Sequence, residues 1–262
     1  MFDFITQTKK QTSWKEAKDA AENGRLNELF KSGDRIPVTL KNGEDIELDV
    51  TFDKNGKGYF VTHNCLQKRH VMNHQATNAG GWEACEMRRY LNEDVFALFP
   101  DELREVIAVT PVVQIVDGKR IVSEDHLFLL SRTQVFGPGW WSDREPEDTQ
   151  LDIFKHERDR VKEWSDEGTW FWWLRSAMLK DWEPITASII DHSGGTNAPW
   201  VDPTNCNAYL TPEEIKANAD NAEVIYEEGA NHLVISVYAD RWHVEQVSGY
   251  TPDRGMFITE CK

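Results

Sequence analysis

The sequence predicts an α+β protein with a mixed, irregular antiparallel sheet, two or more packed helices and long loops. Three observations lead to this class. Short apolar segments alternate with turn-forming residues along most of the chain, residues 13–31 have helical spacing, and residues 170–176 are too apolar for a solvated loop. The length of 262 residues fits one large domain, or one domain with a smaller appendage.

Residues 170–176 read Trp-Phe-Trp-Trp-Leu-Arg-Ser. Alternate residues of a strand face opposite sides, so large apolar groups would lie on both sides of this segment. We therefore predict a central strand that is covered on both faces. Arg175 ends the apolar run, and a buried arginine needs acceptors, so we expect it to bond carboxylates or backbone carbonyls elsewhere in the chain. It is either a structural link between two segments or part of a ligand pocket.

The N-terminal part of the chain has clear local signals. Residues 13–31 look helical, and Ser13 and Glu16 have capping-box spacing at the start. Gly24 breaks the helical pattern, and a second short turn is predicted at residues 26–30. Residues 33–62 read as a small antiparallel meander, with turns at residues 41–44 and 53–58. We expect residues 1–62 to pack on a main domain of residues 63–210.

The main domain is predicted to contain helices at residues 83–92, 101–107 and 151–164. Strands are predicted at residues 109–116, 127–131 and 185–190, and a long surface loop at residues 197–212. Residues 211–262 form either an α/β appendage or closing strands. They begin with a predicted helix at residues 211–221, in which Thr211 caps and Pro212 occupies the first helical position.

The composition excludes some functions. The formal net charge is -16, which argues against binding nucleic acid through its phosphates and against anionic membrane surfaces. No run of eighteen apolar residues occurs, and the first residues do not resemble a secretion signal. We therefore expect a soluble protein of the cytoplasm or of a phage particle.

Two groups of residues could hold a metal ion, although the simplest expectation is that no cofactor is bound. Zinc could be held by His63, Cys65, His70 and His74, but their spacing matches no strong zinc motif and fits a polar loop equally. Calcium could be held by oxygen atoms of Asp191, Asn197, Asp202 and Asn205, which match no defined calcium loop and fit a solvated loop.

No motif of a hydrolase nucleophile, a phosphate-binding loop, a dinucleotide site or a zinc protease occurs. Instead, Trp140, Trp141 and Trp200 lie in loop-like segments beside Gly, Pro, Asp and Asn. Exposed aromatic residues with polar neighbours are common in recognition surfaces, so we predict a binding surface at these residues, with Arg175 as a further candidate. The same tryptophans could instead be ordinary core residues.

Four motifs in order carry a family resemblance: residues 80–83 (Gly-Gly-Trp-Glu), residues 88–92 (Arg-x-x-Leu-Asn), residues 129–131 (Leu-Leu-Ser) and residues 172–176 (Trp-Trp-Leu-Arg-Ser). The pattern resembles an uncharacterised domain family of gut Firmicutes and their phages, over roughly residues 13–210. It is also similar to C-type lectin-like domains, including relatives of the formylglycine-generating enzyme. The glycine-x-arginine-proline closing strand of that superfamily is missing here.

The resemblance implies a C-type lectin-like fold and a phage or mobile-element origin. Together with the missing catalytic motifs, it favours a non-catalytic protein that binds a protein or carbohydrate ligand, or that is structural. Two alternatives stay open: an enzyme with a carboxylate- or metal-based site, and an acidic inhibitor of a basic host protein.

Overall fold

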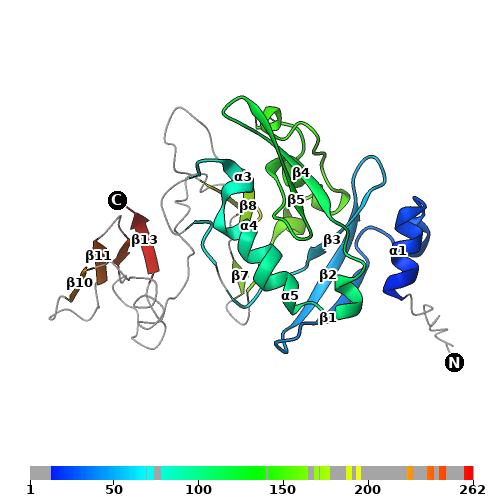
Figure 1. Cartoon of the computed structure of the whole chain (residues 1–262), viewed down its shortest axis with the longest axis horizontal. Helices are drawn as coiled ribbons and strands as arrows, with labels where there is room; N and C mark the ends of the chain where they lie inside the picture. Colours follow the sequence, from blue (N-terminus) through cyan, green and yellow to red (C-terminus); the bar gives the residue numbers. More distant parts are fainter. Residues whose placement is uncertain are drawn as a thin grey trace.

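The structure is a computed structural model that describes residues 13–68, 70–73, 78–139, 141–164, 168–170, 172–177, 187–190 and 193–195, and four strands between residues 223 and 261. In these parts short helices and small antiparallel sheets alternate along the chain, as Figure 1 shows, so the predicted α+β class is confirmed. No helix in the described ranges combines the length and the apolar character that a bilayer crossing requires.

The N-terminal helix forms as its sequence predicts. Helix α1 (Trp14–Glu22) begins with a capping box, in which the Glu16 amide donates to the Ser13 hydroxyl at 3.2 Å and the Ser13 amide donates to the Glu16 carboxylate at 3.0 Å. Gly24 then adopts a positive φ of 66°, and the short helix α2 (Leu26–Leu29) follows.

The predicted meander is also confirmed. Strands β1 (Arg35–Thr39), β2 (Asp45–Phe52) and β3 (Gly58–Thr62) form an antiparallel sheet in the order β1-β2-β3. Gly43 makes the first turn with a φ of 89°. Alternate residues of β2 are buried, which orients the sheet with one face towards the helices and the core.

The helical segment that follows differs from the prediction. Helices α3 (Gly81–Ala84) and α4 (Glu86–Tyr90) replace the single helix expected over residues 83–92. They are separated at Cys85, whose backbone is extended and whose sulfur accepts from the Arg88 amide at 3.4 Å. Burial raises the pKa of the Cys85 thiol to about 12, so this cap is a protonated thiol at neutral pH.

After α4 the chain continues as the π-helical turn η1 (Leu91–Val95), α5 (Phe96–Leu98) and α6 (Asp101–Arg104). Strands β4 (Thr110–Val116) and β5 (Lys119–Asp125) form a hairpin with positive φ at Asp117 and Gly118. The sequence predicted β4 but not its partner.

The strand predicted at residues 127–131 is wrong. These residues lead into helix α7 (Arg132–Phe136), and Ser131 and Gln134 form its capping box. This segment forms no strand pairing. It is joined to β8 by a hydrogen bond, in which the Leu130 carbonyl accepts from the Arg175 amide at 2.9 Å.

The charged helix predicted at residues 151–164 is also wrong. The 3₁₀ turns η2 (Ser142–Arg144), η3 (Asp152–Phe154) and η4 (Glu157–Arg160) are followed by the short strand β6 (Lys162–Glu163). His156 has an extended backbone between η3 and η4, which prevents a continuous helix. The charges favour a helix locally. Burial of Phe154, and the hydrogen bond from the Leu151 amide to the Gln134 carbonyl, instead hold the backbone in separate turns.

The tryptophan-rich segment forms two strands, β7 (Thr169–Trp170) and β8 (Trp172–Ala177). Strand β7 pairs with β6, and β8 pairs with β9 (Ala187–Ile190), in two separate two-stranded sheets. The prediction that this segment is the central strand of a larger sheet is therefore wrong. Its cover on both faces is confirmed. Trp172 and Leu174 belong to one apolar cluster and Trp173 packs against another, so β8 separates the two main cores.

The C-terminal strands form a sheet of their own. They are β10 (Glu223–Tyr226), β11 (Ile235–Tyr238), β12 (Trp242–Glu245) and β13 (Phe257–Cys261), in the order β10-β11-β12-β13. Among the described strands, β13 pairs with β12 alone. The predicted helix at residues 211–221 lies outside the described residues.

Candidate functional site

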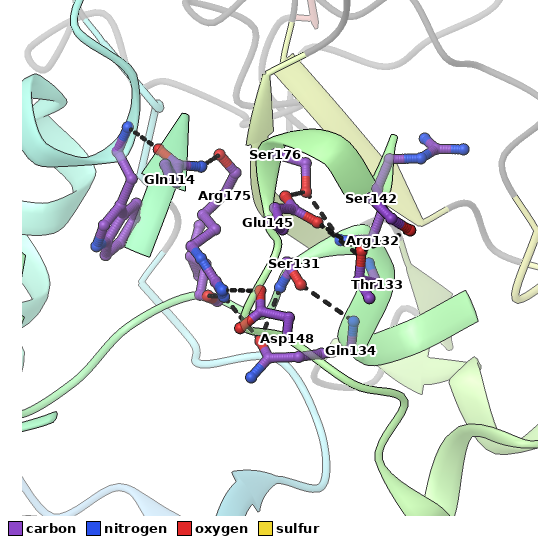
Figure 2. A network of polar contacts seen from close by, with 12 residues as sticks. Gln114, Ser131, Arg132, Thr133, Gln134, Ser142, Glu145, Asp148, Arg175 and Ser176 are labelled. Carbon is purple, nitrogen blue, oxygen red and sulfur yellow. Dashed lines mark hydrogen bonds and ion pairs between the residues drawn. The ribbon is translucent and has the colours of Figure 1, made fainter. Parts of the chain in front are cut away.

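A buried arginine organises a network of polar contacts, which Figure 2 shows. Arg175 on β8 is only 2% exposed. One terminal nitrogen of its guanidinium donates to the Leu129 carbonyl at 2.8 Å and to the Gln134 side-chain oxygen at 2.7 Å. The other donates to the carboxylate of Asp148. The expected carboxylate and carbonyl partners are therefore present, and they come from segments 27 to 46 residues away in sequence.

A buried carboxylate lies next to this arginine. Glu145 is 1% exposed, and one of its oxygens accepts from the Thr133 amide at 3.2 Å and from the Thr133 hydroxyl at 3.1 Å. The other oxygen accepts from the Ser176 hydroxyl, which itself accepts from the Arg132 amide at 2.8 Å. Full pairing of this kind offsets the cost of burying a charge.

These bonds fix the loop of residues 137–148, which we call the anchored loop. Glu145 and Asp148, near its end, bind α7 and β8, while Gly137 opens it with a φ of 81°. Within the loop, the Trp141 indole nitrogen donates to the Gly137 carbonyl at 3.2 Å, and the Gly139 amide donates to the Ser142 hydroxyl at 2.8 Å.

The half-buried ring of Trp141 packs against one cationic and one aromatic side chain. The Arg132 guanidinium carbon is 4.8 Å from the ring centroid, and the Phe136 ring meets Trp141 edge-on at 6.2 Å. Burial lowers the pKa of Arg132, while the charge of Glu145 opposes that change. Figure 2 shows the Arg132 side chain directed away from Arg175.

A second buried network is centred on Asp125, at the end of β5. Its carboxylate accepts from the Trp82 indole at 2.9 Å, from Arg88 Nε at 2.6 Å and from the Ser123 hydroxyl at 2.7 Å. Asn92 donates to the Leu127 carbonyl at 2.8 Å, which fixes the chain beyond Asp125. This network holds α3, α4 and the turn η1 against the hairpin β4–β5.

Gln114 joins the two networks. Its side-chain oxygen accepts from the Trp82 amide at 2.8 Å, and its side-chain nitrogen donates to the Arg175 carbonyl at 3.1 Å. Gly81 lies against the same glutamine with a φ of 64°, and a β-carbon there would come within 2.9 Å of the Gln114 side-chain oxygen. The four sequence motifs therefore meet in one coupled polar framework.

Of the predicted binding residues, Trp140 and Trp200 lie outside the described residues. Trp141 lies on the anchored loop, and Arg175 lies beneath the loop with its terminal nitrogens already bonded. Four further residues of the two networks, Gln114, Asp125, Glu145 and Asp148, were not predicted from the sequence. The one local signal near them is the Ser131-x-x-Gln134 spacing of a capping box, which marks the start of α7 and so locates Gln134, a partner of Arg175.

The predicted zinc ligands have other contacts. The His63 Nδ1 atom is 2.8 Å from Asp49, and the His70 Nδ1 atom is 2.6 Å from the Val71 carbonyl, while the His70 ring stacks on Tyr90. Cys65 is half-buried. His74 and the four predicted calcium ligands lie outside the described residues. Within the described ranges, three or more His, Cys, Asp or Glu side chains are nowhere grouped as a metal site would require.

A further buried group, a lysine, was not predicted from the sequence either. Lys162 is 5% exposed, and its ammonium donates to the carbonyls of Thr62 and His63, so it ties β6 to the end of β3. The Trp172 ring centroid is 5.3 Å away. Burial lowers the pKa of Lys162 to about 8, and the charges of Asp49 and Cys65 oppose this change only in part.

We predict that Lys162→Met changes the pH dependence of stability. Between pH 8 and about 10.5 the unfolded lysine binds a proton that the folded lysine lacks. The free energy of unfolding therefore rises with pH across this window, and the stability that neutral Lys162 contributes at high pH is lost as the pH falls to about 8. The difference in unfolding free energy should move in favour of the wild type by roughly 2–3 kcal/mol from pH 7 to pH 10. Urea unfolding of both proteins at several pH values measures this. Lys155→Met, at an exposed ion pair, is the control and should show a constant difference.

The framework defines a class: an α+β domain built on two coupled, buried polar networks that hold an aromatic loop. The family described as a domain of unknown function, DUF6273, matches residues 56–209, more than half of the chain. The chain belongs to this family, which confirms the resemblance to an uncharacterised domain family. The match begins within the turn before β3, so α1, β1 and β2 precede it. Comparison with curated proteins and with solved structures finds no match.

Proposed function

We propose that this chain is a non-catalytic binding protein whose recognition surface is the anchored loop and whose ligand is a protein or a carbohydrate. The observation that carries the proposal is the attachment of this loop to α7 and β8 through two carboxylates, the buried Glu145 and the partly buried Asp148. Recognition residues are commonly placed on loops that a rigid scaffold positions.

The state of the buried charged groups favours binding over catalysis. A catalytic side chain must reach its substrate, whereas Arg175 and Glu145 are 2% and 1% exposed and bond partners inside the protein. Their role is then to keep the loop in one conformation. A loop that is ordered before binding loses less conformational entropy when a ligand arrives, which raises affinity.

The aromatic content of the loop supports the same function. Trp141 presents a large ring that is held by Arg132, Phe136 and its own bond to Gly137. Rigid aromatic side chains contribute much of the energy at protein interfaces and stack well on other flat or apolar surfaces. Trp140, which precedes it in sequence, is part of the proposed surface.

The proposal predicts that Trp141→Ala weakens ligand binding at least about tenfold, as the loss of an aromatic anchor usually does. Full-length protein is first screened on glycan and peptide arrays, and affinities for the strongest binders are then measured by calorimetry. Trp164→Ala is the matched control, because this tryptophan is also half-buried but lies beside β6 with its indole bonded to Gln67. Binding that is lost equally in both variants, or kept in both, contradicts the proposal, as does a screen without binders.

We also propose that the fold is C-type lectin-like and that the gene belongs to a phage or mobile element. The segments of residues 126–131 and 145–151, which form no helix or strand, and the small paired strands support the first point. The resemblance that the four sequence motifs carry supports the second. An experimental structure that superposes on no lectin-like domain would refute the proposed fold.

A further inference from the structure

Two arginine side chains contact the ring of Phe136, at the end of α7. The guanidinium carbon of Arg132 is 5.5 Å from the centroid of this ring, and that of Arg160 is 4.7 Å from it. Trp141 meets the same ring edge-on at 6.2 Å, so the anchored loop borders this group. Phe136, Trp141 and Arg160 are each partly exposed, and we call these three residues the aromatic–arginine site.

One edge of the Arg160 side chain is fixed. Its Nε atom donates to the Phe154 carbonyl at 3.1 Å, and its own carbonyl accepts from the Trp172 indole at 2.9 Å. Gly194, with a φ of 85°, approaches the turn η4 so closely that a β-carbon there would come within 2.3 Å of the Glu157 carbonyl. Arg160 is therefore held in position before any ligand binds, which lowers the entropic cost of binding.

The opposite edge of this guanidinium is open. Within the described part of the chain, neither terminal nitrogen of Arg160 has an acceptor, and no carboxylate forms an ion pair with it. Arg88 and Arg175, by contrast, each bond a carboxylate. Burial lowers the pKa of Arg160, and the charges of Glu157 and Asp159 oppose that change. A partly buried guanidinium that lacks acceptors is stabilised by an anion that supplies them.

We propose, building on the proposed binding function, that the ligand of the anchored loop is an acidic oligosaccharide. A carboxylate of one sugar binds the terminal nitrogens of Arg160, and a neighbouring sugar ring lies on Trp141. A planar carboxylate accepts two parallel hydrogen bonds from a guanidinium, which a neutral sugar cannot do. Because Trp141 and Arg160 both contact the single ring of Phe136, one short oligosaccharide can reach both.

The size and the charge of the site favour a carbohydrate over a protein. A stable protein interface usually buries about 800 Å² on each partner, whereas this site consists of one cation and two aromatic rings. The formal net charge of the chain is -16, so the extended surface of an acidic protein would be repelled. A short oligosaccharide brings its carboxylates without such a surface, and its ring can cover an aromatic side chain.

Titration calorimetry on the full-length protein tests the proposal. The probes are oligogalacturonate, oligomannuronate and sialyllactose, each beside a counterpart in which the carboxylates are reduced to neutral alcohols. We expect the wild type to bind at least one acidic probe, and its neutral counterpart at least tenfold more weakly. This comparison uses the wild type alone, so it does not depend on how well any variant folds.

Substitutions then locate the carboxylate. Arg160→Gln should weaken binding of the acidic probe at least tenfold and leave binding of the neutral counterpart unchanged. Arg160→Lys should restore part of the affinity, because it keeps the charge but not the planar pair of donors. Arg158→Gln is the matched control, since this arginine belongs to the same turn but its side chain is almost fully exposed and pairs with Asp159. It should bind as the wild type does.

Three results would overturn the proposal: equal binding of an acidic probe and its neutral counterpart, no binding of any acidic probe, or binding of polyglutamate in preference to all of them. Binding of a neutral glycan that is lost in Trp141→Ala but kept in Arg160→Gln would also overturn it, while leaving the proposed function intact. Conversely, acidic-probe binding that is lost in Arg160→Gln but kept in Trp141→Ala would support the carboxylate contact and contradict the proposed function, so the two fail separately.

Discussion

Replacing Arg175 by alanine is expected to lower the free energy of unfolding by about 3–5 kcal/mol. The substitution removes the bonds to Leu129, Gln134 and Asp148 together, and it leaves the Asp148 carboxylate without its cation in a place where that side chain is only 15% exposed. Such a largely buried, unpaired charge costs more than the bonds themselves contribute. Urea unfolding followed by tryptophan fluorescence measures the change.

A matched control is available at the surface. Arg120 also pairs with a carboxylate, Glu147, but both side chains are more than half exposed. Arg120→Ala should therefore cost less than about 1 kcal/mol, as exposed ion pairs generally do. If Arg175→Ala were as mild as Arg120→Ala, the buried network would not be what holds α7, β8 and the anchored loop together.

Asp125→Ala is expected to have the second large effect, again about 3–5 kcal/mol. Asp125 is 1% exposed and is the common acceptor for Trp82, Arg88 and Ser123. Its loss leaves the partly buried charge of Arg88 and two further donors without their shared partner. Because Trp82 is itself 1% exposed and packs in the main core, we expect looser packing there as well, visible as a change in near-ultraviolet circular dichroism.

A double-mutant cycle isolates the charge pair within that effect. Arg88→Ala and Asp125→Ala combined should destabilise less than the sum of the two single changes, by about 1–3 kcal/mol, because residues in one network are not independent. The control cycle combines Arg88→Ala with Asp101→Ala, because Asp101 is not a partner of Arg88 and its ion pairs with Lys41 and Arg104 lie at the surface. Additive effects of Arg88 and Asp125 would contradict the contacts described for them.

These expectations share one physical origin. The family motifs supply the donors, namely Trp82, Arg88 and Arg175, while the carboxylates come from the hairpin β4–β5 and from the anchored loop. Gln114 couples the two centres through backbone atoms of Trp82 and Arg175. The motifs are thus best explained as the framework that fixes the fold, and recognition is left to the loop that this framework holds.

The sequence by itself determined the elements whose signals are local. The capping box of Ser13 and Glu16 and the glycine turn of the meander depend only on neighbouring residues, so α1 and the strands β1 to β3 were predictable. The alternation of Trp172, Trp173 and Leu174 likewise predicted cover on both faces of β8, because alternation is a property of any strand.

Only the tertiary structure decided the rest. Residues 151–164 have charges that suit a helix, but burial of Phe154 and Lys162 imposes two turns and a short strand. The partners of Arg175 could not be chosen from the sequence, because the chain holds 45 acidic residues and nothing local distinguishes Asp148 or Glu145 from the others. A long-range bond depends on where the whole chain brings its segments together, and that is set by burial summed over the fold.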